Sequence, residues 1–141
     1  MWSSVRAMSG IDKNMSDEKN KDKDDTEIRL YCIMRDDIDI PIGKMLAQAG
    51  HAFVSVLEAA NETNRAVVVD YFANAQPKIA LRGNLNAVKR AAGECRQAGI
   101  PHYVVTDAGR TVFPEATVTC IGIGPVDRAS LPKFVARLRL F

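Results

Sequence analysis

The chain has 141 residues, of which 47% are hydrophobic and 26% are charged, with a formal net charge of +2. This length and balance fit one soluble globular domain and exclude two full domains. A bilayer span needs about 20 apolar residues, and the apolar runs here are far shorter, so no membrane segment is predicted. Three cysteines without a CxxC pair or a Cys/His metal pattern argue against a secreted disulfide scaffold and favour the cytoplasm.

The first 26 residues form a charged and weakly hydrophobic tail. Such a segment cannot bury enough apolar surface to offset the entropy of ordering it, so disorder is predicted for residues 1–26. Six acidic and five basic residues give this tail a charge of −1, which leaves +3 for the domain predicted at residues 27–141. This modest excess, carried mostly by arginines, permits a polyanionic partner without requiring one.

The rest of the chain alternates between strand and helix patterns. Strand-forming residues predict strands at 27–34, 78–82, 102–106 and 116–123. Helical periodicity predicts helices at 42–60, 61–75 and 86–98, and a last helix with Ser130 as its N-cap. The order β-α-α-β-α-β-β-α predicts an α/β fold in a single domain, with a four-stranded mixed β-sheet flanked by helices.

One face of the helix predicted at 42–60 has an unusual polar composition. Lys44, Gln48, His51 and Ser55 fall in a stripe about 60° wide, and Leu46 belongs to the apolar face opposite. Solvated helix faces usually mix Glu and Lys, whereas this stripe holds a cation, an amide, an imidazole and a hydroxyl. A functional stripe and a plain water-facing stripe both remain open from the pattern alone.

Gly50 lies in the middle of the same predicted helix. Glycine costs about 1 kcal/mol relative to alanine at such a position, so its presence indicates a close approach by another backbone or a ligand. His51 beside it has two interpretations, because a lone histidine is more often structural than catalytic.

A polar turn follows the strand predicted at 102–106. In α/β folds the carboxyl ends of the sheet strands are the usual ligand site, and Asp107 and Arg110 stand there. Asp107 could orient or deprotonate a water, and Arg110 could clamp a phosphate or brace the loop. Asp-Ala-Gly is also an ordinary turn formula, in which the aspartate bonds its own backbone. Thr117 and Thr119 are predicted to share one face of the next strand.

Several motifs in order resemble one family. GKMLAQAGHA, at residues 43–52, is similar to the GK-x-x-AQ-x-x-HA signature of the type II peptidyl-tRNA hydrolases. Further segments are similar to that family's R-x-D segment, second strand and GIP, DAGRT and IGP segments: 35–37, 78–82, 99–101, 107–111 and 123–125. The resemblance covers residues 28–141 in register.

This resemblance implies hydrolysis of the ester bond of peptidyl-tRNA, which releases free tRNA and peptide, with tRNA as the partner. No cofactor, metal or membrane partner is expected, and a homodimer is compatible with the resemblance. By matching positions it implies a catalytic set of Lys44, Gln48, Asp107, Thr111 and Thr119. The further candidates for substrate binding are His51, Arg110, Arg82, Lys89 and Arg90.

We hypothesise that Asp107 orients or activates a water, while Lys44 and a threonine hydroxyl stabilise the oxyanion. A neighbouring ammonium should lower the pKa of Asp107, so positioning of the water matters more than removal of its proton. A Ser-His-Asp mechanism has little support, because the chain has no G-x-S-x-G motif.

The loop before the last strand departs from the family pattern. Val112 stands where relatives commonly have Gln, and PEAT at residues 114–117 replaces an Ala-Pro-Gly-Ser/Thr stretch. Glu115 thereby adds a carboxylate that would oppose tRNA phosphate. This departure motivates the alternative of a non-catalytic RNA- or protein-binding module with the same fold. A hydrolase of another aminoacyl or acyl ester is a third interpretation.

Overall fold

A four-stranded sheet forms the centre of the protein in the computed structural model, which describes residues 26–110 and 112–141. Its strands are β1 (Arg29–Arg35), β2 (Lys78–Gly83), β3 (His102–Asp107) and β4 (Thr117–Val126). The helices are α3 (Ile42–Thr63), α4 (Arg65–Ala73), α5 (Leu85–Ala98) and α6 (Lys133–Ala136), with a 3-10 turn η2 (Arg128–Ser130). The predicted element order and α/β fold are confirmed, and residues 1–25 of the predicted tail lie outside the described residues.

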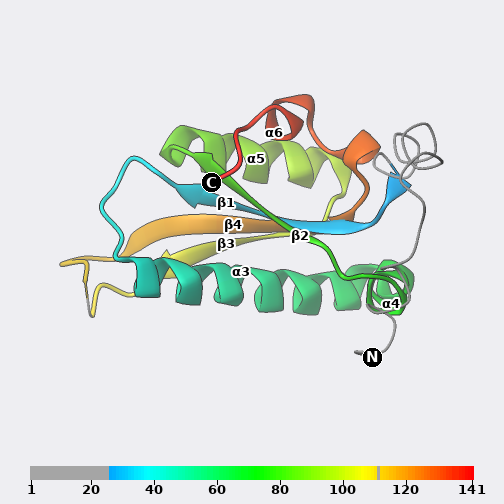
Figure 1. Cartoon of the computed structure of the whole chain (residues 1–141), viewed down its shortest axis with the longest axis horizontal. Helices are drawn as coiled ribbons and strands as arrows, with labels where there is room; N and C mark the ends of the chain where they lie inside the picture. The colour runs from blue at the N-terminus through cyan, green and yellow to red at the C-terminus, as the bar shows by residue number, and fades with distance from the viewer. Residues whose placement is uncertain (1–25, 111) are drawn as a thin grey trace, which may run out of the picture.

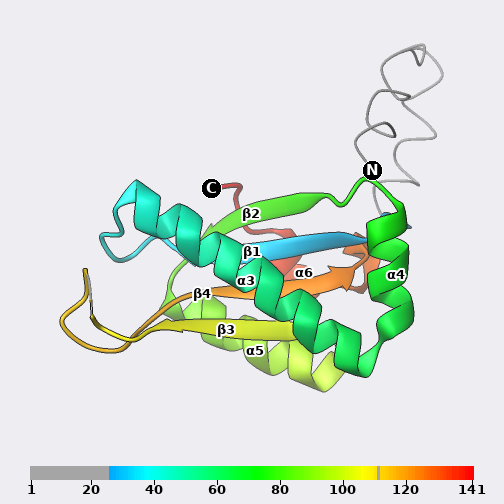
Figure 2. The same ribbon diagram turned by 90° about the horizontal axis from the view of Figure 1, so that it is seen from below.

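The strand order across the sheet is β2-β1-β4-β3. β1 pairs with β2 in parallel and with β4 in antiparallel, and β4 pairs with β3 in antiparallel, so the sheet is mixed as predicted. Helix α3 crosses one face, while α5 and α6 cover the other (Figure 1). Seen from the α3 side, β2 and β3 form the two borders of the sheet (Figure 2).

Apolar side chains of β1 fill the core on both faces of the sheet. Tyr31 and Ile33 belong to the cluster that includes residues of α5, whereas Cys32 and Met34 belong to a second cluster with Ala52 of α3. All seven residues of β1 are buried, because helices cover both faces of this central strand.

Two helix ends show how well local rules predict boundaries. Gly99 ends α5 in the left-handed conformation at φ 69°, as its position after the helix predicts. The prediction that Ser130 caps the last helix is wrong. Asp127 instead accepts the Ser130 N–H at 2.8 Å and caps η2. The residue before Pro132 is held extended, so α6 begins only after the proline.

Helix α3 lies directly on the backbone of β4. A Cβ added at Gly122 would lie 2.5 Å from the carbonyl oxygen of Ala52, so only glycine permits this contact. Outside its own helix, Gly50 has no described atom within 4 Å of an added Cβ, so the close backbone approach expected there occurs at Gly122 instead. As a result Gln48 is buried against the sheet, while Leu46 of the predicted apolar face is 68% exposed.

The two edges of the sheet differ. The C-terminal residues run along β2, where the Arg82 N–H donates to the Arg139 carbonyl at 2.9 Å and the Phe141 N–H donates to the Ala80 carbonyl at 3.0 Å. Figure 2 shows the C-terminus beside β2, at the border opposite β3. Within the described ranges no segment covers the outer edge of β3 in this way.

Candidate active site

Three of the predicted catalytic residues meet where the first turns of α3 pass the end of β3. The ammonium of Lys44 lies 2.5 Å from a carboxylate oxygen of Asp107, the last residue of β3. Gln48 stands one helical turn after Lys44 and is buried. The Lys44 side chain is 20% exposed and that of Asp107 is 9% exposed, so the ion pair borders solvent at its ammonium end.

The backbone of the next turn holds the other oxygen of Asp107. The Gly109 N–H donates to Asp107 Oδ1 at 2.9 Å, which is the local aspartate turn that the sequence allowed. Gly109 adopts φ 77°, and a Cβ there would lie 2.5 Å from the carbonyl carbon of Glu115. The loop therefore folds back on itself, and the carboxylate is fixed from two sides.

These contacts lower the pKa of the Asp107 carboxyl below its ordinary value of 3.8. The hydrogen bond from the Lys44 ammonium is the larger cause and the Gly109 N–H the second. At neutral pH Asp107 is therefore an ionised acceptor and a weak base, suited to orienting a water molecule.

A buried hydrogen bond fixes Gln48. Its side-chain amide donates to the Thr119 hydroxyl at 3.0 Å, and that hydroxyl donates to the Val105 carbonyl at 3.4 Å. Thr119 is completely buried. Its hydroxyl is thus in a position to orient Gln48 and not to touch a substrate directly.

A β-bulge explains how Thr119 reaches the helix. Val105 pairs with Cys120 and Thr106 pairs with Val118, so Thr119 is the extra residue on β4. Simple alternation along the strand does not foresee this irregularity.

Cys120 also lies on the α3 face of β4, as does Gly122 two residues further along the strand. The Cys120 thiol contacts the backbone carbonyl of Gln48 at 3.5 Å, so β4 holds Gln48 by side chain and backbone together. Thr117 instead donates its hydroxyl to the Glu115 carbonyl at 2.9 Å, within the loop. Cys120 and Gly122 were not predicted from the sequence, although a glycine inside a strand is a known signal of close approach.

Arg35 ties the segment before α3 to the sheet. Its guanidinium makes two 3.0 Å hydrogen bonds to the Asp37 carboxylate and one of 2.9 Å to the Val118 carbonyl. The Arg35 side chain also lowers the pKa of the Asp37 carboxyl. This two-pronged contact fixes the approach of the chain to Lys44.

The supporting candidates lie around this centre. His51 is exposed and meets the Tyr103 ring edge-on, with centroids 6.1 Å apart. Arg110 is exposed in the loop that follows Asp107. Thr111 lies outside the described residues, so its predicted role stays a prediction.

Three of the residues predicted to bind the substrate are not brought to this centre. Arg82 lies on the opposite edge strand, with its guanidinium 4.9 Å from the centroid of the Phe141 ring. Lys89 and Arg90 stand on α5, on the other face of the sheet, and Arg90 packs 4.2 Å from the centroid of the Phe134 ring.

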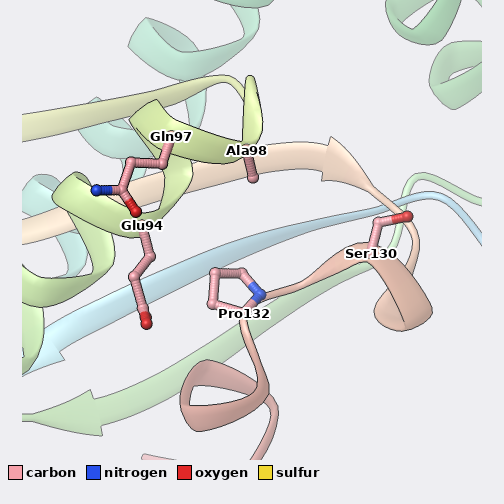
Figure 3. A pocket seen from close by; sticks show the side chains of 5 residues that line it. All are labelled: Glu94, Gln97, Ala98, Ser130 and Pro132. Atoms are coloured by element: carbon pink, nitrogen blue, oxygen red, sulfur yellow. The ribbon is translucent and has the colours of Figure 1, made fainter.

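A shallow hollow between α5 and the segment around α6 contains none of the predicted site residues. Figure 3 shows its lining: Glu94, Gln97, Ala98, Ser130 and Pro132. Among the residues that the structure describes, no three His, Cys, Asp or Glu side chains gather to hold a metal ion. The described helices include none that is both long and apolar enough to cross a membrane.

An ionised carboxylate, an ammonium and an oriented amide at one strand end form the kind of site that positions water and stabilises a developing anion, as in hydrolases. Residues 28–141 match the family model described as peptidyl-tRNA hydrolase PTH2. The chain belongs to this family.

Curated relatives agree with this membership. The peptidyl-tRNA hydrolase of Sulfolobus acidocaldarius is 32% identical over 119 residues, which cover 80% of this chain and 99% of the relative. The protein of the same name from Sulfurisphaera tokodaii is 31% identical over 117 residues, covering 79% and 97%. A third, from Saccharolobus islandicus, is 28% identical over 118 residues, covering 80% and 98%.

Proposed function

We propose that this protein hydrolyses the ester bond of peptidyl-tRNA at the site formed by Lys44, Gln48 and Asp107. The observation that carries this assignment is the Lys44–Asp107 ion pair at the end of β3, beside an amide fixed by β4. Membership of the peptidyl-tRNA hydrolase PTH2 family supports the reaction and its substrate.

Asp107 orients the attacking water in this mechanism. The water oxygen adds to the ester carbonyl carbon, and the bond from that carbon to the ribose oxygen then breaks. tRNA leaves with a free hydroxyl, and the peptide leaves as a carboxylic acid that ionises at neutral pH. Because the pKa of Asp107 is lowered, it acts mainly as a hydrogen-bond acceptor for the water.

Lys44 stabilises the negative charge that develops on the ester carbonyl oxygen. The Gln48 side chain donates one amide hydrogen to Thr119. Its second amide hydrogen can donate to the substrate or the water, and its carbonyl oxygen can accept from them. The role first expected of a threonine hydroxyl at the oxyanion falls to Lys44 and Gln48, because Thr119 is buried. Thr111 remains a predicted member of the site.

The tRNA part of the substrate is expected beyond the strand end, where Lys44 and Arg110 supply positive charge. Since the substrate is a product of translation, we place the reaction in the cytoplasm. A homodimer stays a prediction from the family resemblance, and light scattering of the purified protein would test it.

The alternative is a non-catalytic RNA-binding module. Glu115 motivates it, since its backbone packs against Gly109 beside Asp107 and its carboxylate repels phosphate. The intact Lys44–Asp107 pair favours the hydrolase instead.

The deciding experiment measures release of free tRNA from purified N-acetylaminoacyl-tRNA by wild type, Lys44→Ala and Asp107→Ala. The hydrolase predicts cleavage by wild type that falls in both variants while their circular dichroism stays native. A folded wild type that binds tRNA in a salt-sensitive way without cleaving it would establish the binding module.

A further inference from the structure

The outer edge of β3 is open in the described part of the chain. Tyr103 and Val104 are 40% and 36% exposed. No main-chain hydrogen bond beyond the ladder with β4 is made by residues 102–107 to any described residue. An edge strand in this state presents N–H and C=O groups that can pair with another extended chain.

The ladder itself indicates which groups face outward. The Gly124 N–H donates to the Pro101 carbonyl at 2.8 Å, one step before β3 begins. Bonded and non-bonded pairs alternate in an antiparallel ladder. Tyr103 therefore turns its main-chain groups toward β4, whereas His102 and Val104 turn theirs toward the open edge.

This edge connects two features of the surface. Its C-terminal end is Asp107, which pairs with Lys44 in the candidate active site. Its N-terminal end opens on a hollow between the two helical layers, lined by Thr63 of α3, Cys95 of α5 and His102 among others. Six residues of strand cover about 20 Å between these ends.

We propose that the open edge of β3 binds the peptidyl part of the substrate as an added β-strand, parallel to β3. In this orientation the esterified C-terminal carbonyl of the peptide arrives at Asp107, and the peptide runs back toward His102. The proposal rests on the proposed function, because it assigns a place to the peptide of peptidyl-tRNA.

Main-chain pairing suits this substrate for a chemical reason. The peptides attached to tRNA differ in amino-acid sequence but have the same backbone. Strand addition recognises this common backbone. A second copy of this chain could pair with the same edge, but it would then occupy the approach to Asp107. The position of the catalytic pair at the strand end therefore favours the peptide.

The test compares substrates that share one tRNA and one C-terminal amino acid, with one to six residues in the peptide. Two or three added hydrogen bonds, each improving binding about two- to fivefold, predict a KM about tenfold lower for the six-residue peptide. N-methylation of single peptide amides should raise KM at every second position and leave the alternate positions unaffected.

A pair of variants tests the edge itself. Val104→Pro removes the outward N–H at a position where an edge strand tolerates proline, and it should flatten the dependence of KM on peptide length. Val104→Ala keeps that N–H and should keep the dependence. If Val104→Pro does not fold, the N-methyl series on wild type still decides the question.

The outcomes separate this proposal from the proposed function. Cleavage of the one- to six-residue substrates with a KM that is independent of peptide length would overturn the edge proposal and leave the proposed hydrolase function standing. The absence of alternation in the N-methyl series would have the same meaning. Absence of cleavage for every substrate would overturn the proposed function. Light scattering that shows a dimer in wild type and a monomer in Val104→Pro, with length dependence unchanged, would assign the edge to a second copy.

Discussion

The two edge strands of this sheet differ in whether another segment of the chain pairs with them. At β2 the chain covers its own edge with residues 139–141, through hydrogen bonds of 2.9 and 3.0 Å and the packing of Arg82 on Phe141. At β3 no described segment does the same, and the strand runs into the Lys44–Asp107 pair. A covered edge protects a sheet from unwanted strand pairing. An open edge beside reactive groups therefore indicates that this edge binds another chain as part of the function.

The difference extends to the irregularities of the sheet. β1 and β2 pair in unbroken register, whereas the β3–β4 ladder carries the bulge that presents Thr119 to Gln48. Regular pairing supports the fold on one side. Irregular pairing on the other side re-aims a side chain toward the candidate site.

The largest expected effect comes from Gly122→Ala, at the contact between β4 and α3. The added Cβ would lie 2.5 Å from the Ala52 carbonyl oxygen and push α3 from β4. We expect a loss of about 3 kcal/mol in the free energy of unfolding, measured by urea denaturation, and a loss of activity. Gly50→Ala is the matched control. It meets no described atom outside its helix within 4 Å and should gain about 0.5–1 kcal/mol. Equal stabilities for the two variants would contradict the described seating of α3.

Deleting residues 139–141 makes the β2 edge resemble the β3 edge. Two main-chain hydrogen bonds of about 1 kcal/mol each are lost, so unfolding free energy should fall by about 2 kcal/mol. Sedimentation should show new self-association, while kcat per folded molecule stays unchanged. If the deletion lowered kcat without causing self-association, the β2 edge would also contribute to activity, and the two edges would not differ in function.

Thr119→Val tests the hydrogen bond that Thr119 makes with Gln48 at the bulge. Valine has a similar shape but leaves the buried Gln48 amide without its partner, which should cost about 1–2 kcal/mol and lower kcat about tenfold. Thr117→Val, two residues away, removes only a hydrogen bond within the loop and should change stability by less than about 0.5 kcal/mol. Kinetics and denaturation of the pair decide whether Thr119 positions Gln48.

The smallest effect is a shift in pH dependence at the end of β3. The folded pKa of Asp107 lies below 3.8, so the ion pair stabilises the protein above 3.8 and is lost only as pH falls through the lower folded value. Carboxyl 13C NMR should show a higher titration midpoint for Asp107 in Lys44→Met than in wild type. An unchanged midpoint would show that Lys44 does not set this pKa.

Local patterns predicted the elements and much of the site. Period-two and period-3.6 patterns placed every strand and the three long helices, and Gly99 marked the end of α5. The burial of Gln48 and exposure of Leu46 were not predictable, because the contact of Ala52 with Gly122 sets the rotation of α3. That contact joins residues far apart in sequence.

The bulge was hidden from the sequence for a similar reason. Alternation from Gly122, which faces α3, places Cys120 on the α3 side and Thr119 on the other side, whereas the extra residue brings Thr119 to α3 as well. Which residue bulges depends on the register with β3 and not on β4 alone. The meeting of Lys44 with Asp107 was expected from the family resemblance, and the structure brings the two together.

The role proposed for Asp107 in ester cleavage is tested by the rate of N-acetylaminoacyl-tRNA hydrolysis by the Asp107→Asn variant. The change keeps the shape of the side chain but removes the charge that Lys44 and a water require, so kcat should fall about 100- to 1,000-fold with tRNA binding retained. Asp127→Asn is the control, because it makes the same chemical change in the cap of η2 and should keep the wild-type rate. A wild-type rate for Asp107→Asn would contradict the assignment of ester cleavage to the end of β3.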